Sequence, residues 1–300
     1  MGALLLARDG HLLDPVVLSP LEAPGRRRLR QLVRPELILD ARDRPPDFEA
    51  RVTRALEHSR PDLLVSWFWT RKLPAAWLEA ARLGAIGAHP SLLPRHRGPN
   101  PYFWTIDSGD ELAGVTVHRL GADYDTGAIL AARALPVENR NTWQLARALD
   151  RPSLELLRET AARIASDGGV HEVPQDEALT TWAPEPTGDE LRVDFGWTTE
   201  RVLRRIRALS PTPGLALEVL DVDLFVTSAE PADTYVQALF PGEAQVSDAL
   251  SLRTQDGAVR VTAALFPTAP GSGARKSQSE DVLARTGAEV VALLKRAGRP

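Results

Sequence analysis

The fold of this chain is decided by residues 84–130, which read GAIGAHPSLLPRHRGPNPYFWTIDSGDELAGVTVHRLGADYDTGAIL. Short aliphatic runs in this stretch have the length of strands and are separated by glycine and proline turns. Similar runs upstream alternate with segments whose apolar residues recur at helical intervals. Strands are predicted over Val16–Ser19, Leu37–Asp40, Leu63–Phe68, Ala85–His89, Gly114–His118 and Ile129–Ala132, and helices over Phe48–Ser59 and Ala75–Leu83, with Ala3–Gly10 as the end of another helix. This alternation predicts an α/β fold with a Rossmann-like, doubly wound, mostly parallel sheet.

The sequence downstream of this stretch predicts a second domain. Residues 142–165 carry leucines at helical spacing with Pro152 among them, which indicates one bent helix or two consecutive ones that close a first domain of residues 1–166. Residues 167–189 are rich in Gly, Pro, Asp and Glu and are predicted to be a linker. Residues 190–300 form the second domain, predicted to be a small, OB-like β-barrel. Its predicted elements are a helix over Thr198–Leu209, capped by Thr198, and strands over Val219–Val226, Tyr235–Phe240, Ala249–Thr254 and Val259–Leu265, with a turn at Asp256-Gly257.

Composition narrows the class of protein. The 36 Lys and Arg residues are balanced by 40 Asp and Glu residues, so no global positive field favours DNA as a partner. Cysteine is absent, which excludes disulfides and thiolate zinc sites, and the sequence has no HExxH-type spacing, so no metal site is predicted. No run approaches the roughly 18 apolar residues of a membrane helix, and the N-terminus lacks a signal-peptide pattern. These features predict a cytoplasmic protein that does not bind membranes.

Residues 84–130 also resemble a known family. The shared positions are His89-Pro-Ser-Leu-Leu-Pro94, Arg97-Gly98, Pro101, Gly109, Gly114-Val-Thr116 and Asp125-Thr-Gly127. In order and spacing they are similar to the core of the 10-formyltetrahydrofolate-dependent formyltransferases. The likeness continues at Arg192-Val-Asp194, Arg204-Arg-Ile-Arg207 and Pro211-Thr-Pro-Gly214. The resemblance implies 10-formyltetrahydrofolate as co-substrate and an open β-barrel as the C-terminal domain.

The resemblance implies catalytic roles for His89 and Asp125. The family uses an Asn, His and Asp triad, and the histidine and aspartate fall at these two positions. The asparagine position, two residues before the histidine, is Gly87 here. In formyl transfer, negative charge develops on the formyl oxygen while the amine loses a proton. His89 would donate to that oxygen or carry the proton, Asp125 would orient the ring, and Ser91, His96, Asn100 or a backbone group would replace the missing amide.

Folate contacts are also carried over from the family. They fall on Trp69, Leu73, Pro74, Ser91, Gly121, Asp123 and Tyr124. Other readings of single residues stay open at this stage. Trp67, Phe68 and Trp69 are equally typical of a core cluster. A lone histidine after a strand is more often structural, and an aspartate before Thr-Gly often caps a turn, so the motif is what favours catalytic roles for His89 and Asp125.

The sequence favours a small-molecule amine as acceptor, such as an amino sugar nucleotide or a hydroxyornithine-like compound. Residues 190–300 carry 13 Lys and Arg against 14 Asp and Glu, which offers little attraction for tRNA phosphates. Arg26, Arg27, Arg28, Arg30 and Arg34 form one basic cluster, so formylation of methionyl-tRNA is a less favoured alternative. Two further alternatives are hydrolysis of 10-formyltetrahydrofolate and a non-catalytic folate-binding module, because Gly87 removes an expected donor.

Overall fold

A computed structural model describes residues 2–18, 26–33, 37–40, 47–67, 69, 71–166, 169–267 and 282–297. The chain divides into two compact units by spatial proximity. The first comprises Met1–Pro99, Ala113–Leu135 and Ala148–Ala183, and the second Asn100–Leu112, Pro136–Arg147 and Pro184–Pro300. This division by spatial proximity does not test which residues fold independently. The predicted division into two domains, residues 1–166 and 190–300, with a linker over 167–189, therefore stays a prediction.

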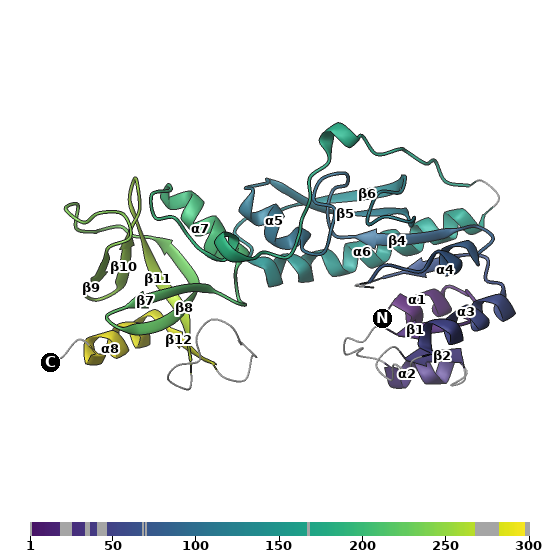
Figure 1. Ribbon diagram of the computed structural model, residues 1–300, viewed down its shortest axis with the longest axis horizontal. Coiled ribbons are helices and arrows are strands. Elements are labelled where there is room, and N and C mark those ends of the chain that lie inside the picture. Colours follow the sequence, from purple (N-terminus) through teal and green to yellow (C-terminus); the bar gives the residue numbers. More distant parts are fainter. Residues whose placement is uncertain are drawn as a thin grey trace. The chain divides into compact units, whose positions relative to one another are not determined.

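The first unit holds the strands predicted in the N-terminal half. Its elements, some of which extend into the second unit, are α1 (Gly2–Arg8), β1 (Val16–Leu18), α2 (Arg26–Leu32), β2 (Ile38–Asp40), α3 (Phe48–Ser59), β3 (Leu64–Ser66), α4 (Ala75–Glu79), β4 (Ala85–His89), β5 (Leu112–Arg119), β6 (Ile129–Pro136) and α6 (Thr142–Ala165) (Figure 1). Strands β1 and β2 pair in parallel, and β3, β4, β5 and β6 form a four-stranded sheet in that order. Strand β3 runs parallel to β4, whereas β5 is antiparallel to β4. The predicted α/β fold with parallel strand pairs is confirmed.

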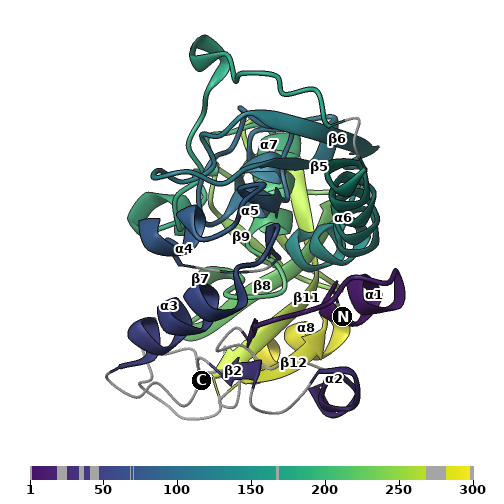
Figure 2. The same cartoon turned by 90° about the vertical axis from the view of Figure 1, so that its right-hand side faces the viewer.

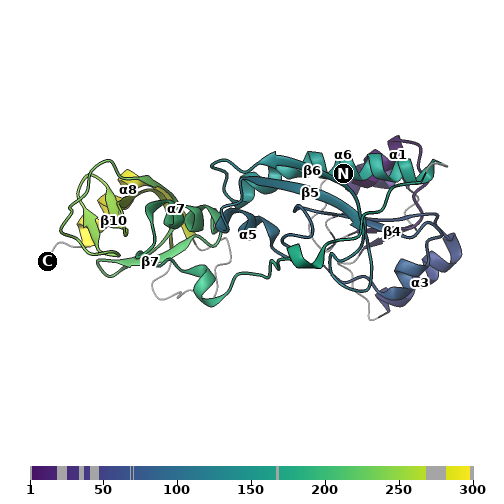
Figure 3. The same ribbon diagram turned by 90° about the horizontal axis from the view of Figure 1, so that it is seen from above.

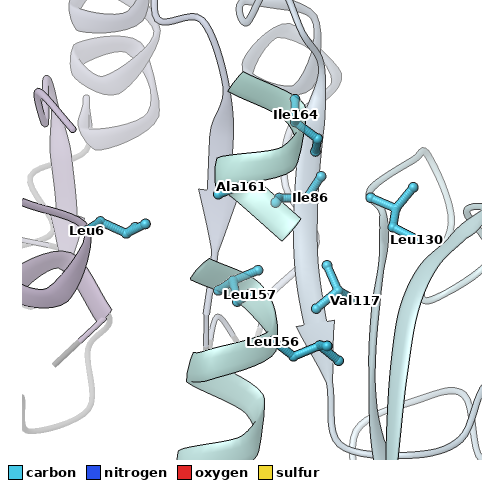
Figure 4. Packing of buried hydrophobic residues seen from close by; sticks show 8 residues of the cluster. All are labelled: Leu6, Ile86, Val117, Leu130, Leu156, Leu157, Ala161 and Ile164. Atoms are coloured by element: carbon cyan, nitrogen blue, oxygen red, sulfur yellow. The ribbon is translucent and has the colours of Figure 1, made fainter. Parts of the chain in front are cut away.

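Helices cover both faces of this sheet because neighbouring strand residues point to opposite sides. Leu64 packs in a cluster with α3 and α4, whereas Val65 packs in a cluster with α6. On the α6 side, buried side chains of α1, β4, β5, β6 and α6 form one cluster (Figure 4), and α6 runs beside β5 and β6 (Figure 2). Its members are Leu6, Ile86, Val117, Leu130, Leu156, Leu157, Ala161 and Ile164. The side chains of β4 that alternate with Ile86 are therefore turned away from α6.

Two helix predictions meet different outcomes. Residues 142–165 form a single helix, α6, that contains Pro152, rather than two consecutive helices. The prediction of a helix over Ala75–Leu83 is wrong at its end, because α4 ends at Glu79. The backbone N–H groups of Arg82 and Leu83 donate instead to the carbonyls of Pro61 and Asp62. A tertiary contact thus replaces the last helical turn.

The second unit contains an antiparallel, curled sheet. Its elements are α5 (Pro101–Asp107), a 3-10 helix (Gly188–Leu191), α7 (Thr199–Ala208), β7 (Leu215–Val219), β8 (Val222–Pro231), β9 (Ala244–Val246), β10 (Leu250–Arg253), β11 (Ala258–Pro267), β12 (Val282–Thr286) and α8 (Gly287–Ala297). The strand order is β7-β8-β11-β10-β9, with β12 paired to β11, and α8 packs against β9, β10, β11 and β12. Figure 3 shows α8 beside β10. The β-rich fold class predicted for the C-terminal part of the chain is confirmed.

Several strand predictions in this unit are wrong in detail. Val219–Val226 spans the end of β7, a turn and the start of β8, because Leu220 and Asp221 adopt positive φ angles of 51° and 59°. Tyr235–Phe240 contains no strand. The sequence patterns did not predict β9, β12 or α8. The cap at Thr198 is confirmed, since its side chain accepts from the N–H of Arg201.

A buried ion cluster joins α5 and α7 within the second unit. Asp107 accepts two hydrogen bonds from Arg201, at 2.7 and 2.9 Å, and two from Arg205, at 2.6 and 3.0 Å. Arg205 also donates to the carbonyls of Asp189, Glu190 and Arg192. Burial raises the pKa of Asp107, but the hydrogen bonds from Arg205 and Arg201 outweigh it and hold that pKa below its usual value. Asp107 is therefore a charged anchor for α7 and the segment before it.

None of the helices in the described ranges is both long and apolar enough to cross a bilayer.

Candidate active site

His89 is the last residue of β4, on the face turned away from α6. Its side chain is 8% exposed, and Nε2 lies 2.8 Å from the carbonyl oxygen of His96. A carbonyl only accepts, so Nε2 carries a hydrogen. The loop that brings His96 back to His89 is held by Thr116, whose hydroxyl accepts from the N–H of Leu93 and donates to the carbonyl of Ser91.

Asp125 lies beside His89, as their predicted pairing requires. Oδ2 of Asp125 is 3.4 Å from Nδ1 of His89 and accepts a 3.0 Å hydrogen bond from the N–H of Gly98. The aspartate side chain is 16% exposed, and its backbone has a φ of 57°. Both nitrogens of His89 are thus engaged, so a proton shuttle through Nε2 requires the bond to His96 to open.

A second histidine, His118, contacts the other oxygen of the same carboxylate. Nε2 of His118 is 3.5 Å from Oδ1 of Asp125, and Nδ1 is 2.8 Å from the carbonyl of Arg119. His118 is the cross-strand partner of Gly87 on β5. No local sequence motif marks His118, although strand alternation places it on the face of β5 that carries Thr116, the cross-strand partner of His89. The carboxylate therefore lies between two imidazoles.

Burial lowers the pKa of His118 to about 4, against the opposing effect of the Asp125 charge and with a further lowering by His89. Because the carbonyl of Arg119 only accepts, the neutral ring carries its hydrogen on Nδ1. His118 is thus neutral at pH 7.

This burial predicts a pH-dependent stability. The folded-state pKa lies below the ordinary value of 6.5, so the unfolded chain binds the His118 proton first as the pH falls. We expect stability to decrease from about pH 6.5 down to about pH 4, by more than about 1 kcal/mol. His118→Met should flatten this part of the profile in urea unfolding at several pH values. An equally steep profile in the variant would contradict the assignment.

Position 87, where the family has an asparagine, carries no side-chain amide because it is a glycine. A Cβ atom on Gly87 would lie 2.7 Å from Cδ2 of Leu120, so Leu120 fills the space beside the glycine. Two of the suggested substitute donors are already engaged. The hydroxyl of Ser91, 1% exposed, donates to the carbonyl of Arg95, and the side-chain amide of Asn100 donates to Glu185. The backbone N–H of His96 donates to Thr181.

The predicted folate-contacting residues occupy different surroundings. Trp69 and Leu73 pack against the apolar cluster of α3 and α4, with the rings of Trp69 and Trp77 6.2 Å apart. Pro74 precedes α4, and Tyr124 is half exposed. Lys72 and Asp123 form an exposed ion pair at 3.5 Å, which links the segment of Leu73 and Pro74 to the loop of Asp123 and Tyr124. Gly121 has open space where a Cβ would lie.

The roles of these residues in folate binding stay predictions. Phe68 lies outside the described residues. Trp67, whose indole N–H donates to Ser153, packs with the α6 cluster. Among the residues that the structure describes, no group of three or more His, Asp or Glu side chains is arranged to hold a metal ion.

Comparisons with known proteins agree with the motif. The family described as "Formyl transferase" matches residues 15–156, and "Formyl transferase, C-terminal domain" matches residues 187–270. A methionyl-tRNA formyltransferase of Ralstonia nicotianae is 31% identical over 223 residues, which are 72% of this chain and 67% of that protein. One of Acidiphilium cryptum is 35% identical over 219 residues, 73% of this chain and 69% of that protein.

A solved structure shares the fold. HypX from Aquifex aeolicus, in complex with tetrahydrofolic acid, superposes with a TM-score of 0.65 at 24% identity; the match covers 94% of this chain and 47% of HypX. The chain thus spans under half of HypX and about two thirds of the two methionyl-tRNA formyltransferases. By sequence, domain order and fold, this chain belongs to the 10-formyltetrahydrofolate-dependent formyltransferase family.

Proposed function

We propose that this protein transfers the formyl group of 10-formyltetrahydrofolate to a primary amine in the cytoplasm, with His89 and Asp125 at the reacting centre. The observation that supports this most is the 3.4 Å approach of Nδ1 of His89 to Oδ2 of Asp125 inside the matched formyltransferase region. Both side chains are largely buried, where electrostatic interactions are stronger than in water.

The proposed reaction forms one C–N bond and breaks another. The amine nitrogen attacks the formyl carbon, the tetrahedral intermediate collapses, and the bond from that carbon to N10 breaks. The amine loses a proton and N10 gains one, so a group that accepts and returns a proton lowers both barriers. Asp125, with His89 and His118 beside it, is suited to hold that proton between the two steps.

The first candidate acceptor is the amine of methionyl-tRNA, because the relatives at 31% and 35% identity bear that name. On α2, the side chains of Arg27, Arg28 and Arg30 are exposed while Leu29 is buried, so this helix offers a local basic face; Arg34 lies outside the described residues. Binding through such a face would weaken steeply with salt.

The second candidate is a small amine, such as an amino sugar nucleotide or a hydroxyornithine-like compound. The balanced charge of residues 190–300 favours it.

One assay separates these possibilities. The protein is incubated with 10-formyltetrahydrofolate and initiator methionyl-tRNA, a panel of small amines, or no acceptor, and both tetrahydrofolate and formylated product are measured. Product from tRNA supports the first candidate, and product from a small amine the second. Loss of the formyl group without any acceptor indicates a hydrolase. Folate binding without turnover under all conditions indicates a binding module and overturns the proposal.

A paired substitution tests whether Gly87 is a steric requirement. We expect Gly87→Asn to destabilise the protein by about 1–3 kcal/mol, because its Cβ meets Leu120. Adding Leu120→Ala should recover part of that loss, so the two changes should be less harmful together than their separate effects sum to. Urea unfolding of the four proteins measures the coupling, and strict additivity would show that Leu120 does not fill the site.

A roughly hundredfold higher kcat in the double variant than in the wild type would indicate that the natural site lacks an oxyanion donor.

A further inference from the structure

Residues 173–183, predicted to belong to the linker, are hydrogen-bonded to the loops that carry the candidate active site. The backbone groups of Val173 and Ile129 bond in both directions, at 2.8 and 2.9 Å. Arg97 donates its backbone N–H to the carbonyl of Thr181 at 2.9 Å and accepts from the N–H of Ala183 at 2.7 Å. Most side chains of the segment are exposed, so polar contacts rather than apolar burial hold it in place.

Gln175 connects the two loops through both ends of its side-chain amide. Nε2 donates to the carbonyls of Asp125 and Gly127, each at 2.7 Å. Oε1 accepts from Nε and Nη2 of Arg97, at 3.0 and 2.8 Å. Carbonyls only accept and a guanidinium only donates, so the orientation of this amide is fixed by its partners.

Arg97 is itself held rigidly. Its side chain is 2% exposed, and its two terminal nitrogens donate to the carboxylate of Glu177 at 3.0 and 2.8 Å. A buried guanidinium with paired contacts on two sides has little freedom to move. Gln175 is therefore attached to a fixed point.

The Asp125 loop needs such a support because its backbone is strained. Asp125 adopts a φ of 57°, a left-handed conformation that costs free energy for a residue with a Cβ. At Gly127 a Cβ would come within 1.9 Å of the carbonyl oxygen of Arg119, so the chain passes very close to β5 there. The two carbonyls that Gln175 holds belong to these two residues.

We infer that Gln175 is a positioning residue, which acts through Asp125 by fixing the backbone that aims its carboxylate at His89 and His118. The effect on turnover rests on the proposed function. The effect on the geometry of the site does not.

The test compares two substitutions. Gln175→Met keeps the length of the side chain and removes all four hydrogen bonds. Gln175→Glu keeps an acceptor for Arg97 but sets an oxygen against two carbonyls. We expect both variants to stay folded and to lose about 10- to 100-fold in kcat, with KM for 10-formyltetrahydrofolate changing much less, since small displacements of reacting groups are costly. Gln175→Glu keeps the acceptor for Arg97, so a loss of kcat in this variant would assign the effect to the two hydrogen bonds that Nε2 donates.

An NMR measurement reads the geometry without turnover. The imidazole ¹⁵N resonances of His89 and His118 should shift in Gln175→Met relative to the wild type. Gln245→Met is the matched control, because the side chain of Gln245, on β9, accepts from the N–H of Val236 and does not belong to the candidate active site, so both kcat and these resonances should stay unchanged. Unchanged resonances in Gln175→Met, or a kcat within twofold of the wild type in a folded variant, would overturn the inference. If the wild-type protein transfers no formyl group, the proposed function alone is refuted. The NMR comparison then still tests the role of Gln175.

Discussion

Asp125→Asn is expected to lower kcat by a factor on the order of 10³ to 10⁴ while the protein stays folded. The amide keeps the shape of the carboxylate and one oxygen for the N–H of Gly98, so the loop retains that contact. It removes the negative charge that lies 3.4 Å from His89 and 3.5 Å from His118. Without the carboxylate, the side chain at position 125 cannot accept the proton that the amine loses or return it to N10.

The measurement is steady-state formyl transfer with the acceptor identified in the assay above. Asp62→Asn is the matched control, because Asp62 forms an exposed pair with Arg82 and should leave kcat within about twofold of the wild type. Wild-type turnover in Asp125→Asn would show that the paired side chains are structural.

The second large effect concerns stability. Asp107→Ala should reduce the free energy of unfolding by about 3–5 kcal/mol, because it leaves Arg201 and Arg205 without their buried counter-ion. Arg205 would keep its three carbonyl acceptors but lose its bonds to α5. Urea unfolding measures the loss.

Glu200→Ala on α7 is the control for Asp107→Ala. It removes the exposed partner of Arg204 and should cost no more than about 0.5 kcal/mol. The pKa of Asp107 is held low in the folded protein, so its contribution is present at neutral pH and should be lost as the pH falls below about 4. Equal costs for the two variants would contradict the role assigned to Asp107.

Local sequence signals predicted the elements whose bounds the residue pattern itself marks. Strand β4 and helix α3 have the predicted bounds, and α6 begins and ends as its leucine spacing indicates. The signals failed where tertiary contacts or unusual turns decide. The Leu220-Asp221 turn has no glycine or asparagine, and its first positive-φ position is a leucine, so the local pattern does not separate β7 from β8.

The same distinction applies to the candidate site. His89 and Asp125 belong to a motif of fixed spacing, so their approach could be expected. His118 needs the register of β5 against β4 before its place becomes visible. Gln175 lies 50 residues from Asp125 in a segment whose composition is that of a connector, and no local pattern marks a residue that acts through a distant backbone carbonyl.

The contacts of residues 173–183 bear on how the molecule is made and how it can be divided. A fragment that stops at residue 166 would contain both His89 and Asp125, yet it would lack every partner that Arg97 and the two loop carbonyls find in Thr181, Gln175 and Glu177. During synthesis these hydrogen-bond partners are missing until Ala183 has left the ribosome. The loops around His89 and Asp125 therefore gain these hydrogen bonds only after residues 173–183 are present.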